Sequence, residues 1–161
     1  MPRITAVLHT ENDALRLGRC LETLLPCDEI LIVDHGSCDD TAHVAHEYGA
    51  RVMATVAGSS PDRYLRTAEV HIQDWILCLD PRESLTEGLC ASLFEWKSQP
   101  VSASTPCSVF LREETAEGWV DHPTPQTRLI PPNWNLWNET LPLFEPSAPI
   151  LEGELLRFVF P

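Results

Sequence analysis

Short apolar runs and longer amphipathic segments alternate through the first hundred residues of the chain. Apolar runs bounded by polar residues predict buried strands, which we expect at residues 4–8, 29–33, 51–56 and 75–79. The segments that follow them repeat apolar residues at helical spacing and predict helices at about 13–25, 39–48, 61–73 and 84–97. Strands that alternate with helices favour an α/β fold, with a mostly parallel sheet covered by helices on both faces.

Residues typical of helix boundaries stand at the ends of these segments. Asn12 or Asp13 is placed to cap the first helix, and Gly49 follows the second helix where glycine is favoured. Ser84 precedes Glu87 by three residues, which is the spacing of a capping box at the start of the last helix.

The pattern changes after residue 100, where most of the fourteen prolines lie. Helix becomes unfavourable there, and short strands are expected at 109–111, 127–130 and 151–160. We therefore predict one domain over 1–161, in which an α/β half at 1–99 is followed by an irregular, partly antiparallel region at 100–161.

Composition narrows the function classes. The formal net charge of −13 argues against binding to nucleic acid, whose phosphates require a basic surface. No apolar run approaches the roughly 20 residues of a spanning helix, and residues 1–20 lack the pattern of a secretory signal. The six cysteines form no Cys-x-x-Cys pair and are interpreted as reduced thiols of a cytoplasmic protein.

Two of the predicted strands end in a carboxylate. Asp34 follows the run at 29–33, and Asp80 follows the run at 75–79 with Glu83 three residues later. Open α/β sheets bind ligands at the carboxyl ends of their strands, so these acids predict a ligand site. The loop at 9–12 has no glycine and the chain has no P-loop, which removes dinucleotide and P-loop ATPase sites. Acids at strand ends remain typical of a diphosphate held through a metal ion.

These motifs resemble the family 2 glycosyltransferases of GT-A fold, especially the small bacterial branch that adds sugars to lipopolysaccharide cores. The similarity is carried by Thr5 to Asn12, by Val33-Asp34-x-Gly-Ser-x-Asp-Asp-Thr, and by Trp75-Ile-Leu-x-Leu-Asp-x-x-Glu. It continues through 127–130, 134–139 and 151–153 in the order of that branch. The resemblance implies a nucleotide-diphosphate sugar as donor, with UDP as the expected nucleotide, and a glycan or lipid-linked acceptor in cell-envelope synthesis. It also implies a cytoplasmic location, either free or peripherally associated with the inner membrane face.

The resemblance implies roles for individual residues on the donor side. Thr10 and Asn12 would lie against the nucleotide, and Asp34 would accept a hydrogen bond from the uracil or ribose. Asp80 would contact the nucleotide and, with Glu83, would ligate a divalent cation, Mg²⁺ or Mn²⁺, on the diphosphate.

Further residues are implied on the acceptor side. Glu139 matches the acid that would deprotonate the acceptor in an inverting transfer. Arg63 would contact the nucleotide phosphates, and contacts to phosphate or acceptor are implied for Arg82, Arg128 and Trp137.

Three polar positions depart from the family pattern. Arg82 replaces the middle acid of the Asp-x-Asp motif, so a metal would lose a ligand or the arginine would take over part of its work. Asn138 and Arg157 replace two histidines. An alternative function is therefore a catalytically impaired relative that binds a nucleotide sugar or acts as a partner subunit.

Overall fold

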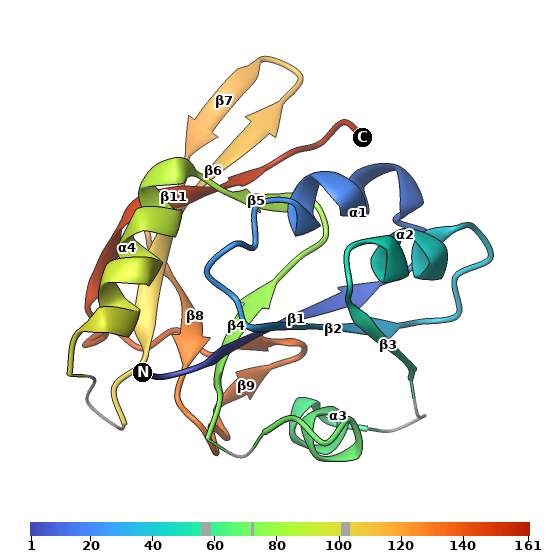
Figure 1. Cartoon of the computed structure of the whole chain (residues 1–161). Coiled ribbons are helices and arrows are strands. Elements are labelled where there is room, and N and C mark those ends of the chain that lie inside the picture. Colours follow the sequence, from blue (N-terminus) through green and yellow to red (C-terminus); the bar gives the residue numbers. More distant parts are fainter. Residues whose placement is uncertain (56–58, 72, 101–103) are drawn as a thin grey trace.

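One twisted sheet of nine strands organises the part of the chain that the computed structural model describes, which is residues 1–55, 59–71, 73–100 and 104–161 (Figure 1). The strand order is β3-β2-β1-β4-β8-β6-β11-β5, and β7 pairs with β6 at the side of this path. The strands are β1 Ile4–Thr10, β2 Glu29–Asp34, β3 Arg51–Ala54, β4 Trp75–Leu79, β5 Glu83–Leu85, β6 Cys107–Thr115, β7 Gly118–Asp121, β8 Gln126–Ile130 and β11 Ile150–Arg157. A separate small hairpin consists of β9 Trp137–Asn138 and β10 Leu141–Pro142.

The first four strands are parallel, as the alternating pattern predicts. Strand β1 pairs with β2 on one side and β4 on the other, so the carboxyl ends of these three strands meet at one edge. Beyond β4 the sheet is mixed, because β8 is antiparallel to β4 and β6 is antiparallel to β8. The α/β fold with a mostly parallel first half and a partly antiparallel C-terminal region is confirmed.

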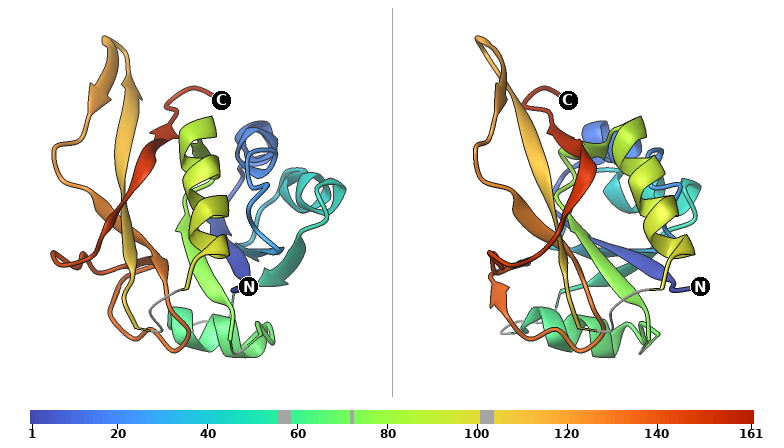
Figure 2. Two further views of the ribbon diagram at one scale, coloured as in Figure 1. Left: turned by 60° about the vertical axis from the view of Figure 1, so that its left-hand side comes forward. Right: turned by 90° about the vertical axis from the view of Figure 1, so that its left-hand side faces the viewer.

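Alternate residues of the strands pack into two hydrophobic cores, one on each face of the sheet. The inward positions Ile4 and Leu8 of β1 pack with helices α1 (Ala14–Leu21), α2 (Thr41–Glu47) and α4 (Glu87–Ser98). The intervening Val7 joins the opposite core, which contains Tyr64 of α3 (Pro61–Thr67). This period-two exchange places helices on both faces of the sheet. Figure 2 shows α4 along β11 and α3 on the other side of the sheet.

Three predicted helices have bounds that differ by more than two residues from those expected. The helix predicted for 13–25 ends at Leu21, because the backbone nitrogens of Thr23 and Leu24 donate to carbonyls three residues back instead of four.

The helix predicted for 61–73 ends at Thr67, because Glu69 takes a left-handed φ of +53° and Val70 N donates to the Leu65 carbonyl. This is a Schellman ending without the usual glycine, so the sequence contained no stop signal. Residue 56 of the predicted third strand and residue 72 of the predicted helix lie outside the described residues.

The last predicted helix begins later than its capping-box spacing suggests. Thr86 is the N-cap, since its hydroxyl accepts a hydrogen bond from Leu89 N at 3.2 Å. Ser84 instead lies in β5, where it pairs with Leu156 of β11. A strand partner about seventy residues away decides this boundary, and local spacing does not reveal it.

Candidate functional site

The ends of β1 and β2 are joined by a hydrogen-bond network on Asp34. Thr10 and Asp34 are opposite each other in the strand register, and Thr10 Oγ1 donates to Asp34 Oδ1 at 2.8 Å. Ser37 donates to the same carboxylate from its backbone nitrogen at 3.0 Å and its hydroxyl at 2.6 Å. Burial by itself would raise the pKa of Asp34, but these hydrogen bonds together hold that pKa below its usual range. Asp34 is therefore an ionised, oriented acceptor at the sheet edge.

Asn12 fixes the neighbouring loop. Its backbone has a φ of +54°, a left-handed conformation that asparagine tolerates better than most residues. Its backbone nitrogen donates to Ser37 Oγ at 2.9 Å, and its side-chain Oδ1 accepts from Cys38 N at 2.8 Å. Asn12 thus ties the loop after β1 to the loop after β2.

Two histidines that were not among the expected site residues also lie at this edge. His9 Nδ1 and His35 Nε2 are 2.9 Å apart, and the His9 ring contacts Tyr64 edge-on at 5.6 Å between centroids. Burial, with the nearby His35, lowers the pKa of His9 to about 4, so His9 is neutral at physiological pH. The available signal was that His9 precedes Thr10 in β1 and His35 directly follows Asp34, the last residue of β2.

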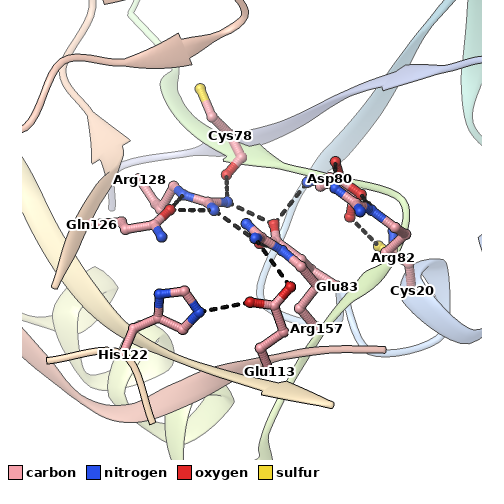
Figure 3. Close-up of polar contacts among 10 residues, drawn as sticks. All are labelled: Cys20, Cys78, Asp80, Arg82, Glu83, Glu113, His122, Gln126, Arg128 and Arg157. Carbon is pink, nitrogen blue, oxygen red and sulfur yellow. Dashed lines mark hydrogen bonds and ion pairs between the residues drawn. The ribbon is translucent and has the colours of Figure 1, made fainter. Parts of the chain in front are cut away.

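The turn after β4 places Asp80 and Arg82 side by side (Figure 3). Asp80 Oδ1 accepts from the Arg82 backbone nitrogen and from Arg82 Nε, both at 2.9 Å, and Oδ2 accepts from Nη2 at 3.1 Å. Burial by itself would raise the pKa of Asp80, but the bonds and charge of Arg82 lower it overall. Asp80, which was expected to bind a metal, is thus paired with Arg82, the residue that replaces the middle acid of the Asp-x-Asp motif.

Glu83 lies inside the protein, with no exposed surface. Its oxygens accept two hydrogen bonds from Arg128, at 2.6 and 2.8 Å, and one from Arg157 Nη2 at 3.0 Å. The backbone nitrogen of Asp80 donates to it at 2.8 Å. Burial opposes ionisation, but the charge of Arg128 and its hydrogen bonds keep the pKa of Glu83 below its usual range. A metal at Glu83 would have to displace two arginines.

Arg128 was expected to contact phosphate or acceptor, but it is buried inside the protein. Only 1% of its surface is exposed, and its remaining donors bond to Gln126 Oε1 and to the Cys78 carbonyl. The guanidinium is used entirely within the protein, where it links β8, β4 and the turn that holds Glu83. The ion-pair chain continues outward through Arg157 to Glu113, which bonds to His122 at 2.7 Å (Figure 3).

The other expected residues lie around the β9–β10 hairpin and α3. Glu139 is exposed at the hairpin turn, with a φ of +56°. Trp137 is half-buried, and its indole nitrogen donates to Asp62 Oδ1 at 3.0 Å, which fastens the hairpin to α3. Arg63 is exposed on α3. A small enclosed gap under the hairpin is lined by His9, Tyr64, Cys78, Trp137 and Thr140, among others, and its lining includes neither Glu139 nor Arg63.

The comparisons with known proteins bear on this geometry. No family model matches the chain. An uncharacterised glycosyltransferase of Rickettsia felis is 31% identical over 90 residues, which are 55% of this chain and 32% of that protein. A TPR repeat-containing protein of Synechococcus elongatus is 30% identical over 124 residues, 76% of this chain and 30% of that protein. The chain thus spans about a third of the length of these curated relatives.

Solved structures decide the fold. Glucosyl-3-phosphoglycerate synthase from Mycobacterium tuberculosis, in complex with Mn²⁺ and UDP-glucose, superposes with a TM-score of 0.52 at 19% identity. The match covers 69% of this chain and 44% of that one. The fold is GT-A. The sequence motifs predicted a resemblance to glycosyltransferases. The curated relatives confirm this resemblance, and the structural neighbours confirm the fold.

Proposed function

We propose that this GT-A chain binds a UDP-linked sugar at the edge where β1, β2 and β4 end. The observation that carries the proposal is that Thr10, Asp34 and Asp80 stand at the carboxyl ends of three neighbouring parallel strands. Ligands of open α/β sheets bind at such edges. The structural neighbour with bound UDP-glucose supports the choice of nucleotide.

The side chains suit a nucleoside. Asp34 is oriented by three donor atoms, Thr10 Oγ1, Ser37 N and Ser37 Oγ, so it can accept a hydrogen bond from uracil or ribose without reorganising. Thr10 and Asn12 border the same position, and Arg63 is exposed on α3 as the proposed phosphate contact.

Replacement of Asp34 by alanine tests this assignment. We expect the free energy of UDP binding to become less favourable by about 1.5–3 kcal/mol, the contribution of a hydrogen bond to a charged group. Asp40→Ala is the matched control, because Asp40 is an exposed acid nearby that makes no side-chain cap bond to α2. Titration calorimetry with UDP measures both variants. Equal affinities for Asp34→Ala and the control would remove Asp34 from the nucleotide site.

We propose that the chain transfers the sugar to a hydroxyl of a glycan or lipid-linked acceptor with inversion. Glu139 would take the hydroxyl proton as the oxygen attacks the anomeric carbon, and the bond to the leaving UDP would break on the opposite face. Glu139 is exposed at the turn of the β9–β10 hairpin, which Trp137 fastens to α3. Its position supports access to an acceptor arriving from solvent.

Glu139→Gln separates binding from transfer. UDP-glucose affinity should stay unchanged, whereas UDP release in the presence of a panel of glycan acceptors should slow by about 100-fold or more, the usual contribution of a general base. Glu117→Gln, at another exposed turn, is the control. An unchanged rate for Glu139→Gln would assign the base to a different residue.

The residues at the end of β4 do not fit a divalent cation. Solved complexes of the structural neighbour include Mn²⁺ with UDP. In this chain Asp80 is paired with Arg82, Glu83 is enclosed by two arginines, and no three metal-ligating side chains cluster among the described residues. A metal ion there would have to displace these arginines from the two acids.

A second candidate is a nucleotide-sugar-binding relative without turnover. The Asp80–Arg82 pair favours it, because the pair neutralises the acid that would otherwise face a cation.

Within the described residues, no helix has the length and apolar character needed to cross a bilayer. We propose either a free protein or one peripherally associated with a membrane that contains a lipid-linked acceptor.

A further inference from the structure

We propose that Arg82 supplies, in place of a divalent cation, the positive charge opposite the donor diphosphate. This inference rests on the proposed nucleotide-sugar site and concerns how that site neutralises its ligand. Arg82 lies directly after the β4 end that carries Asp80, at the edge where the diphosphate is proposed to bind.

The backbone of Arg82 is held from two sides. Its amide nitrogen donates to Asp80 Oδ1 at 2.9 Å, and its carbonyl accepts from Phe158 N at 3.0 Å. Glu83 N closes the turn by donating to the Asp80 carbonyl at 2.9 Å. The guanidinium therefore projects from a turn tied to both β4 and the segment after β11.

Asp80 orients the guanidinium and leaves part of it free. A guanidinium has five N–H donors, and the two side-chain bonds to Asp80 use one on Nε and one on Nη2. The three remaining N–H groups make no hydrogen bond within the described part of the chain, and the side chain is 43% exposed. The planar fork of arginine matches two oxygens of a phosphate, so these donors can bind a diphosphate while the pair with Asp80 persists.

The two arginines paired with Glu83 do not compete for this role. Arg128 and Arg157 are bound to Glu83, and Arg157 also faces Glu113 at 3.8 Å. Lysine and arginine total 11 against 24 acids in the chain, so a diphosphate meets repulsion over most of the surface. Of the three arginines paired with Asp80 or Glu83 in the described part of the chain, Arg82 is the one with a 43% exposed side chain and donors still free.

The test is calorimetric titration of the whole chain with UDP, in EDTA and in excess MnCl₂. We expect the wild-type protein to bind UDP equally in both buffers. Arg82→Gln should bind about 10-fold or more weakly in EDTA, as expected for loss of charged hydrogen bonds. Arg82→Asp should bind weakly in EDTA and recover about 10-fold or more with Mn²⁺, because the introduced carboxylate completes a pair of acids with Asp80.

Arg112→Gln is the matched control, because Arg112 is 44% exposed, is paired with an acid and lies on β6. It should bind UDP like the wild type, and thermal melts of each variant should show that the fold is retained. Wild-type binding that requires Mn²⁺ would overturn the role of Arg82 and leave the nucleotide site standing. Tighter or equal binding by Arg82→Gln would also overturn it, since the pair would then block the site. Absence of UDP binding in both buffers would overturn the proposed function itself.

Discussion

Gly153→Ala should lower the free energy of unfolding by about 2–5 kcal/mol. Gly153 has a φ of +88°, where an L side chain costs about 1–2 kcal/mol. A Cβ there would also lie 2.6 Å from the Gly88 carbonyl carbon and 2.7 Å from Leu89 Cα. These atoms belong to the backbone of α4, so they cannot rotate away, and overpacking of this kind costs about 1–3 kcal/mol. Urea denaturation followed by circular dichroism measures the change.

Gly49→Ala separates the two contributions to this loss. Gly49 has a comparable φ of +77°, but a Cβ there would have nothing within 4 Å. Gly49→Ala should therefore lower the free energy of unfolding only by the cost of the left-handed backbone conformation, about 1–2 kcal/mol. If Gly153→Ala lost no more than Gly49→Ala, the close approach of β11 to α4 would not be a determinant of stability.

Arg128→Met should lower the free energy of unfolding by about 3–5 kcal/mol, because it removes a partner from a fully buried carboxylate. Arg128 and Glu83 are both almost completely enclosed and share two hydrogen bonds. The pKa of Glu83 is held below its usual range, so its stabilising contribution is present above the unfolded pKa and is lost as the pH falls through the folded pKa. The difference from the wild type should therefore narrow in acid, and denaturation at several pH values measures it.

Arg112→Met is the control for this substitution. Arg112 pairs with Asp121 at the surface, and such a pair contributes less than about 1 kcal/mol. If Arg128→Met lowered the free energy of unfolding as little as Arg112→Met does, Arg157 and the Asp80 backbone nitrogen would be sufficient partners for Glu83.

Local patterns predicted the first half of the fold well. The run at 75–79 coincides with β4, and the runs before it mark β1 and β2 within one or two residues. Burial on two faces gives these strands a continuous apolar character that needs no knowledge of their partners. Gly49 likewise ends α2 through a Schellman bond from Ala50 N to the Ala45 carbonyl, as its position predicted.

Contacts between distant segments were outside the reach of these patterns. Ser84 belongs to a strand and not to the start of the last helix, because β11 lies beside it. Arg128 stood in a predicted strand just before the apolar Leu129 and Ile130, which was the one local sign that it would need a buried acid.

The sequence alone determined that acids stand at the ends of β2 and β4 and that Arg82 interrupts the second motif. Period-two burial and turn residues are local properties, so they can be read along the chain. Only the tertiary structure decided which acid faces solvent and which is neutralised. Glu83 is enclosed because β8 and β11 bring Arg128 and Arg157 to it from 45 and 74 residues away, and strand register, which depends on the whole sheet, sets those pairings.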